Sequence, residues 1–220
     1  MCIRDRYTAP RLSLGVNLYY MKYKDQLVPT GMVNDDSNAL NTNVPDSYRR
    51  GVELSASWRA TGWFTVGANA TFSQNRIENY VDALKDSPTY GKELGDMTIA
   101  YSPDVIANAF LNFHHRGFEA VFHTQHVGKQ YFTNNENDAL SLDAYCVTNL
   151  NLAYTFRTRS ARSVRLGLLI NNLFNAEYES NGYGYSYMDT WSGPAPVRID
   201  EAYYFPQAPL NVLANVTVKF

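Results

Sequence analysis

The chain has 220 residues, of which 45% are hydrophobic, 14% are aromatic and only 18% are charged. Disordered chains contain few aromatic residues, so this composition excludes a disordered protein. A net charge of −2 without basic runs argues against nucleic-acid binding. The two cysteines, Cys2 and Cys146, exclude a disulfide framework and a CxxC metal site.

No stretch of the sequence approaches the roughly 18 consecutive apolar residues that a transmembrane helix needs. A membrane-spanning strand needs only about 9 to 11 residues of alternating polarity, so a membrane β-barrel stays open. The first residues, Met1 to Arg6, contain neither an apolar segment nor a small-residue cleavage site and are therefore no signal peptide. We expect residues 1–7 to be unstructured or non-native, and residues 8–220 to be a fragment of a longer exported protein.

Alternation of apolar and polar residues with period two recurs eight times along the chain. Each such segment predicts a β-strand with one apolar face. The eight segments cover residues 12–20, 52–58, 64–72, 105–113, 118–124, 148–156, 164–170 and 212–220.

The connections between these segments alternate between short and long. Short connections occupy residues 60–62, 114–117 and 157–163, and long polar ones occupy residues 25–49, 75–103, 128–143 and 173–209. Compact soluble domains seldom contain such long loops, whereas outer-membrane barrels combine short periplasmic turns with long extracellular loops. The sequence therefore predicts an all-β fold: an antiparallel, up-and-down segment of a transmembrane β-barrel with about eight strands and a periplasmic C-terminus.

Aromatic residues gather at both ends of the predicted strands, as expected for girdles at two lipid–water interfaces. The short-turn girdle comprises Trp58, Trp63, Phe64, Phe113, Phe118, Tyr154, Phe156 and Phe220. The long-loop girdle comprises Tyr20, Tyr23, Phe72, Phe132, Tyr145, Tyr204 and Phe205. The general preference of aromatic residues for strands is the alternative explanation.

The last predicted strand ends on Phe220 and is apolar at every second position. This pattern resembles the C-terminal signal by which the barrel-assembly machinery recognises outer-membrane proteins, since an open strand edge can be captured by β-augmentation. The residues concerned are Val212, Ala214, Val216, Val218 and Phe220.

Several motifs resemble the β-barrel of TonB-dependent outer-membrane receptors. Residues 171–178, Asn-Asn-Leu-Phe-Asn-Ala-Glu-Tyr, are similar to a characteristic motif near the C-terminus of that family. Residues 17–28, 47–54 and 204–209 also resemble its barrel strands and the approach to its last strand. The resemblance begins at about residue 8 and covers nearly the whole remaining chain.

The resemblance implies a barrel of about 22 strands with a plugged lumen, of which this chain supplies the last eight. It further implies active uptake of a scarce ligand, such as a ferric siderophore, haem, cobalamin or a glycan. Its partners would be outer-membrane lipid, the barrel-assembly machinery and the TonB complex. The plug and the TonB-contacting segment lie outside this chain, so we do not expect it to transport alone.

The last long loop is rich in aromatic residues and carries one arginine. Such residues suit stacking on a ligand and gripping it, although they could instead pack loop against loop. The candidate ligand contacts are Tyr183, Tyr185, Tyr187, Trp191, Arg198 and Tyr203.

Neither a catalytic nor a metal site is predicted, and no cofactor is implied. His123 and His126 are three residues apart on a strand and so face opposite sides, while His114 and His115 fall on a short turn. The acidic loop residues lack EF-hand spacing; they are Asp35, Asp36, Asp82, Asp86, Asp96, Asp189, Asp200 and Glu201.

Two other functions remain as alternatives. The chain could be a complete small eight-stranded barrel with a structural or adhesive role, but many inward positions hold Gly, Ser or Asn, which would fill the interior of so narrow a barrel poorly. An outer-membrane enzyme would require an essential histidine. The receptor fragment is the function that the sequence favours.

Overall fold

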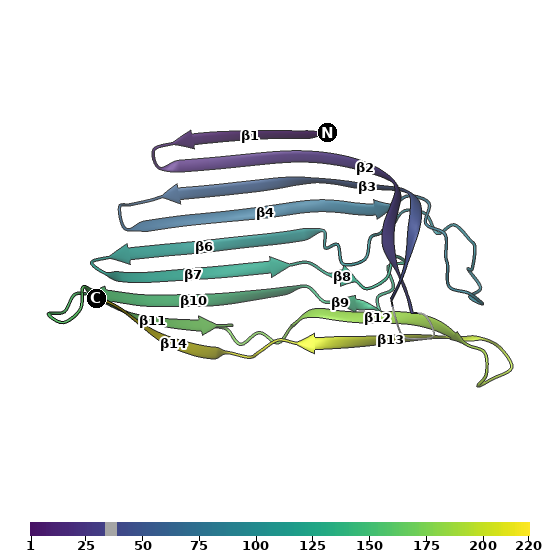
Figure 1. The fold of residues 1–220 in the computed structure, drawn as a ribbon. Coiled ribbons are helices and arrows are strands. Elements are labelled where there is room, and N and C mark those ends of the chain that lie inside the picture. The colour runs from purple at the N-terminus through teal and green to yellow at the C-terminus, as the bar shows by residue number, and fades with distance from the viewer. Residues whose placement is uncertain (34–38) are drawn as a thin grey trace.

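The computed structural model describes residues 1–33 and 39–220, which form an antiparallel all-β architecture (Figure 1). Successive strands of the wall run in opposite directions and are connected at alternate ends. The strands are β1 (Cys2–Ala9), β2 (Leu12–Val33), β3 (Ala39–Arg59), β4 (Phe64–Ile77), β5 (Met97–Thr98), β6 (Val105–His115), β7 (Phe118–Val127), β8 (Gln130–Tyr131), β9 (Ser141–Leu142), β10 (Tyr145–Phe156), β11 (Ser163–Asn171), β12 (Glu179–Asp189), β13 (Val197–Pro206) and β14 (Asn211–Lys219).

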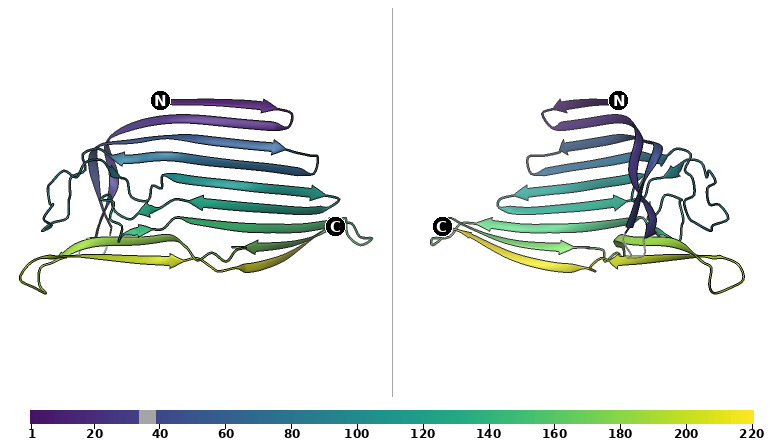
Figure 2. Two further views of the ribbon diagram at one scale, coloured as in Figure 1. Left: turned by 180° about the vertical axis from the view of Figure 1, so that it is seen from behind. Right: turned by 45° about the vertical axis from the view of Figure 1, so that its right-hand side comes forward.

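One large sheet contains most of these strands, in the order β1-β2-β3-β4-β6-β7-β10-β11-β14, with β5 attached to β4. Strands adjacent in the sheet follow one another along the chain, as in an up-and-down barrel wall. β12 pairs with β13, and β8 pairs with β9, outside this sheet. Among the described residues β1 and β14 are edge strands that do not pair with each other, so the sheet is open (Figures 1 and 2).

The cross-strand register places apolar residues opposite one another on a single face of the sheet. One row runs through five neighbouring strands as Trp58, Val66, Leu111, Phe122 and Leu150. Because side chains alternate between the two faces, the residues between them form polar rows on the other face. Asn69, Asn108 and Gln125 form one of these rows. All eight predicted strands are present, and the all-β, antiparallel prediction is confirmed.

The apolar face of the wall is exposed. Trp58 is 52% exposed, and Val216 is 66% exposed. A soluble sandwich would bury such a face in a core, whereas a barrel wall presents it to lipid. The buried hydrophobic residues lie mainly at the long-loop end, so the sheet itself encloses no sealed core.

Aromatic rings gather in two groups at the short-turn end of the apolar face. The Trp63 and Phe113 ring centroids are 5.2 Å apart, and those of Phe113 and Phe118 are 5.9 Å apart. Farther along, Tyr154 stacks on Phe156 at 5.9 Å. The fold therefore brings six of the eight residues of the predicted short-turn girdle into ring contacts.

The beginning of the chain differs from the sequence-based expectation. Residues 1–7 were expected to be unstructured or non-native; they are structured, because β1 pairs with β2 from Cys2↔Tyr19 to Ala9↔Leu12. Backbone hydrogen bonding to an open strand edge requires no alternation of side chains, which explains why the period-two pattern did not predict a strand here. The strand fits imperfectly, because Asp5 pairs with Val16 and so stands on the apolar face.

Two predicted long loops also contain regular structure. The expected loop at residues 25–49 is largely an extension of β2 and β3, which stay paired from Tyr23↔Ser47 to Pro29↔Asn41. The expected loop at 173–209 contains the β12–β13 hairpin. The extended β2–β3 hairpin bends at its far end across the ends of the other strands towards β12 (Figures 1 and 2). No helix able to cross a bilayer occurs in residues 1–33 and 39–220.

Candidate functional site

The β12–β13 hairpin gathers four of the six predicted ligand-contact residues on one face. Tyr183 lies opposite Tyr203, and Tyr185 lies opposite Glu201. The Tyr183 and Tyr203 rings stack with centroids 4.9 Å apart and an interplanar angle of 14°. Tyr185 lies 6.5 Å from Tyr203 and 6.3 Å from Tyr187, so the rings form a ladder along the hairpin.

Glu201 organises this tyrosine ladder. The hydroxyl of Tyr185 donates to its Oε2 at 2.6 Å, that of Tyr203 to the same oxygen at 2.9 Å, and that of Tyr187 to Oε1 at 3.1 Å. Hydrogen bonds from Tyr185 and Tyr203 lower the pKa of the Glu201 carboxyl. The bond to Glu201 raises the pKa of each of the three hydroxyls, most strongly that of Tyr185.

Arg198 lies on the opposite face of the hairpin and does not join the tyrosine ladder. Its Nε donates to Oδ1 of Asp200 at 2.9 Å, and its terminal nitrogen donates to Oγ of Ser186 at 2.9 Å. Ser186 in turn donates to Asp200 at 2.6 Å. Arg198 is thus engaged within the hairpin, which favours a structural role over the predicted grip on a ligand.

Trp191 lies in the turn of the hairpin, apart from the ladder. Its side chain is 84% exposed. The backbone amides of Trp191 and Ser192 donate to the Asp189 carboxylate at 2.9 and 3.1 Å, which fixes the turn. The fold therefore separates the predicted set into a four-tyrosine ladder, one tip residue and one residue on the reverse face.

The reverse face of the hairpin packs on the 128–143 segment. A Cβ on Gly184 would meet the Phe132 ring and Leu140 at 2.9 Å, and a Cβ on Gly182 would meet Phe132 at 2.8 Å. Phe132 and Leu140 are 1% and 0% exposed. The centroids of the Phe132 and Tyr204 rings are 5.8 Å apart. Phe132 was predicted as a girdle residue; the structure instead places it in a loop core.

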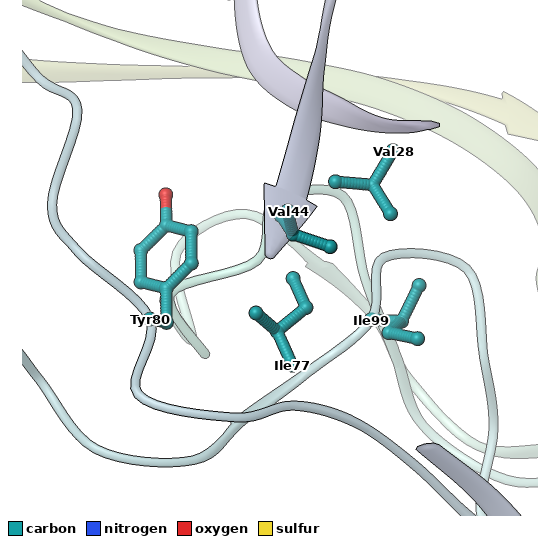
Figure 3. Packing of buried hydrophobic residues seen from close by; sticks show 5 residues of the cluster. All are labelled: Val28, Val44, Ile77, Tyr80 and Ile99. Carbon is teal, nitrogen blue, oxygen red and sulfur yellow. The ribbon is translucent and has the colours of Figure 1, made fainter. Parts of the chain in front are cut away.

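A second hydrophobic cluster joins the bent β2–β3 hairpin to the strands beside it. It contains Val28 and Val44 from the hairpin with Ile77, Tyr80 and Ile99 (Figure 3). In Figure 3 the aliphatic side chains converge on one another, while the Tyr80 hydroxyl points away from them. The two clusters give the loop end a core of its own.

Two polar residues of the 128–143 segment tie the loop clusters together. Asn134, 1% exposed, accepts a bond from the Ala100 amide at 2.8 Å and donates to the Pro29 carbonyl. Glu136 accepts bonds from the Thr98 amide and hydroxyl at 3.0 and 2.5 Å and pairs with Arg76. Burial alone would raise the pKa of Glu136, but these hydrogen bonds outweigh it and lower the pKa.

The asparagine-rich motif at residues 171–178 has a structural role. Asn172, which has a φ of 50°, bonds to the amide and carbonyl of Ala176 at 2.8 Å and to the Ala208 carbonyl at 3.2 Å. The Asn175 side chain accepts from the Leu210 amide at 2.9 Å. Asparagine tolerates the left-handed region better than most residues, which explains its presence here.

The structure assembles no metal site from the described residues, in which no group of three or more His, Cys, Asp or Glu side chains could hold an ion. Asp82 is occupied by Ser87 at 3.2 Å and by Thr89 at 2.5 Å. His123 and His126 lie in different rows of β7, as predicted. Asp35 and Asp36 lie outside the described residues.

Sequence reasoning missed three residues that organise this region: Glu201, Asn134 and Glu136. Glu201 was noted only as an acidic loop residue. Its position two residues before Tyr203, opposite a Tyr-x-Tyr-x-Tyr run, is a period-two signal that could have revealed the hairpin. Asn134 and Glu136 carry no comparable signal, because their partners lie far away in the sequence.

A family model described as TonB dependent receptor-like, beta-barrel, matches residues 3–173. The chain belongs to this family. The family consists of transport receptors and not of enzymes. Its barrel is embedded in the outer membrane, which agrees with the exposed apolar face of this wall.

Solved structures of TonB-dependent receptors and related transporters share the fold. The ferric yersiniabactin uptake receptor FyuA from Yersinia pestis is 19% identical, with a TM-score of 0.66 over 98% of this chain and 28% of its own. The ferric preacinetobactin receptor BauA from Acinetobacter baumannii is 12% identical, with a TM-score of 0.66 over 100% and 29%. The copper transporter OprC is 19% identical, with a TM-score of 0.66 over 98% and 30%. This TonB-dependent receptor chain thus spans less than a third of those proteins.

Proposed function

We propose that this chain forms part of the wall and outer loops of a TonB-dependent receptor that takes up a scarce ligand actively. Residues 8–220, together with the earlier residues of β1, would be the last strands of its barrel. The long loops would face the cell exterior, and the short turns and C-terminus would face the periplasm. The plug and the TonB-contacting segment would come from the rest of the protein. The single observation that carries the proposal is the apolar face of the wall, which has large exposed residues from β2 to β14 and lies beside a packed loop cluster.

The tyrosine ladder is the proposed ligand contact within this chain. Flat aromatic rings offer stacking surfaces, and Tyr183 and Tyr203 are 46% and 45% exposed. Glu201 holds the hydroxyls in place, which reduces the conformational entropy that a ligand would have to remove. Loop capture would precede rearrangement of the plug, driven by TonB from the inner membrane.

The ligand class remains open among ferric siderophores, haem, cobalamin and glycans. Ferric complexes are the first to test, because several structural neighbours are named as receptors for them. Barrel walls are generic supports, and specificity resides in the loops and the plug. The alternative of a complete eight-stranded barrel is not favoured, because the wall is an open sheet with two unpaired edges.

The uptake experiment uses the full-length receptor in cells that lack their own receptors. Radioactive iron is supplied as ferric citrate, a ferric catecholate or a ferric hydroxamate, with and without an intact TonB system. We expect TonB-dependent accumulation of one complex and its reduction by Tyr183→Ala together with Tyr203→Ala. The matched control is Tyr90→Ala, an exposed tyrosine outside the ladder. Uptake that persists without TonB would overturn the receptor proposal.

Orientation is tested separately by cysteine labelling. Ser192→Cys lies at the β12–β13 tip and Ser160→Cys in the short turn after β10. A membrane-impermeant maleimide should label the first in intact cells and the second only after the outer membrane is permeabilised. The parent protein, with its exposed Cys2 and Cys146, sets the background. The reverse pattern would refute the proposed orientation.

A further inference from the structure

Charge is distributed unevenly between the two ends of the wall. No turn or strand end on the short-turn side, at residues 9–11, 59–63, 114–117 and 157–162, contains an Asp or Glu. Glu119, the acidic residue beside one of these turns, is already bound by both terminal nitrogens of Arg165 at 2.8 Å. The cations of this end, which we call the cationic rim, are Arg11, Arg59, Arg116, Arg157, Arg159, Arg162 and Lys219.

The cationic rim is not used to stabilise the fold. All seven side chains are exposed, and none takes part in an ion pair within residues 1–33 and 39–220. Arg116 is held outward by a tight turn in which it has a φ of 47° and Gly117 a φ of 86°. That pair of positive φ values is typical of two-residue hairpin turns. Exposed cations without partners remain available to an external anion.

Four of these cations surround one hollow. An open depression of about 820 Å³ is lined by Arg116, Arg157, Arg162 and Lys219, together with Thr155, Ser163, Phe156 and Phe220. Arginine forks bind phosphate oxygens in a bidentate manner, and the hydroxyls of Thr155 and Ser163 can donate further bonds. The cations and hydroxyls therefore suit a phosphate group.

The aromatic side of the hollow distinguishes a lipid from a free phosphate. Phe156 belongs to the apolar rows, where it pairs with Val164, and its ring stacks on Tyr154. Phe220 is 94% exposed. The register sets Thr155 against Arg165 and Ser163 against Lys219 in the polar rows, so the hollow lies at the strand ends between the two faces. An anion that is bound here therefore has the surface that faces acyl chains on one side, as the headgroup of a phospholipid does. Free phosphate has no apolar part to use that side.

We propose that the cationic rim binds the phosphodiester headgroups of anionic phospholipids, with Arg116, Arg157, Arg162 and Lys219 forming one headgroup site. The leaflet concerned is the periplasmic one, an assignment that rests on the orientation in the proposed function. The opposite end of the wall carries most of the 21 acidic residues, which repel the same headgroups. The charge asymmetry thus favours placing the cationic end of this segment in the leaflet that contains the anionic phospholipids.

The test uses the full-length receptor in mild detergent with a mixture of phosphatidylglycerol and phosphatidylcholine. Native mass spectrometry counts the phosphatidylglycerol molecules retained on each receptor. The test variant is Arg116→Gln with Arg157→Gln and Arg162→Gln. The control is Lys24→Gln with Lys85→Gln and Lys92→Gln, which removes the same charge from three exposed residues at the loop end.

We expect the test variant to lose roughly tenfold or more in apparent affinity for phosphatidylglycerol, since a cation near an anionic surface contributes about fivefold. The control should stay within about twofold of the parent, and salt at about 0.5 M should weaken the parent towards the test variant. A second variant, Arg157→Lys with Arg162→Lys, keeps the charge and should retain most of the binding. It also guards against a test variant that fails to fold.

Three results would overturn the inference: retention by the test variant equal to the parent, an equal loss in the control, or complete displacement of lipid by excess inorganic phosphate. The last would identify a free-phosphate site. Failure of the proposed function is seen separately, because labelling of Ser160→Cys in intact cells would reveal the reverse orientation, whereas lipid retention in detergent does not depend on orientation.

Discussion

The wall and the loop cluster of this chain obey different physical rules. The wall has large exposed residues on its apolar face, such as Leu54 at 41% and Leu166 at 45%, and derives its order from strand pairing. The loop cluster buries Ile77 and Leu140 completely, as a soluble domain does. The difference shows that lipid replaces a protein core for the wall, whereas loops in water must supply their own core.

The largest effect is expected from emptying the loop core. Phe132→Ala should cost about 3–5 kcal/mol, as removal of a buried aromatic side chain usually does. The cost should stay local, because the rings and glycines that Phe132 contacts lie in the β12–β13 hairpin and at Tyr101, outside the wall strands. Hydrogen exchange of the full receptor should accelerate in the 128–143 segment, the hairpin and the residues around Tyr101, and not in the wall strands. Phe174→Ala is the matched control, because Phe174 is 70% exposed. Acceleration throughout the wall would refute the separation of the two regions.

The stability of the wall should depend on where a charge is placed, on its apolar face or on its polar face. Ala109→Arg places a cation in the apolar rows and should cost about 2–4 kcal/mol near the middle of the bilayer. Asn108→Arg places the same charge one residue away, on the opposite, polar face of the sheet, and should cost much less. Folding yield into lipid vesicles and the urea midpoint measure both variants. Equal losses would mean that the apolar face does not meet hydrocarbon.

A smaller effect is expected at the polar link between the loop clusters. Asn134→Ala leaves the Ala100 amide and the Pro29 carbonyl without their partner, at a cost of about 1–3 kcal/mol. Limited proteolysis of the β2–β3 hairpin should become faster. Asn135→Ala is the comparison, since within residues 1–33 and 39–220 the Asn135 side chain accepts a bond only from the nearby Thr133 hydroxyl. Similar proteolysis of both variants would remove Asn134 from its linking role.

The smallest effect concerns the exposed tyrosine ladder and depends on pH. Because its folded pKa lies below 4.5, the Glu201 contribution is complete above pH 4.5 and is lost as the pH falls through the folded value. Because its folded pKa lies above 10, the Tyr185 contribution is complete below pH 10 and is lost as the pH rises through the folded value. Hydrogen exchange of the hairpin should therefore be slowest between about pH 4.5 and 10 after correction for the intrinsic rate. The pKa values of Asp189 and Asp200 in the same hairpin are also lowered, so Glu201→Gln should reduce the acid limb without abolishing it. An unchanged acid limb would exclude Glu201 as a cause.

The wall could be predicted from the sequence because a strand between lipid and lumen must alternate. Trp58, Val66 and Leu111 fall on the same face for that reason, and their register follows. The loop core could not be predicted, because its contacts join distant segments whose sequences carry no periodic signal. Phe132 was accordingly assigned to a girdle, and the extension of β2 beyond Tyr23 was taken for a loop.

The candidate site was predicted in part. The tyrosines were selected for their chemistry alone, yet four of them share one face of β12–β13. Arg198 was selected for the same reason but has its partners on the other face. Deciding between the two faces requires the hairpin register, which composition does not contain. Whether the ladder touches a ligand remains a prediction for the uptake experiment.

The bonds of Asn172 to Ala208 and of Asn175 to Leu210 close the base of the β12–β13 excursion. The two ends of the long insertion between β11 and β14 are thus held together next to these strands, as the ends of a tight turn would be. A change in the length or sequence of the excursion need not shift the alignment of the two strands below it. Such a closure makes the register of β11 and β14 independent of the hairpin, whose own sequence is restrained instead by the loop core against which Gly182 and Gly184 pack.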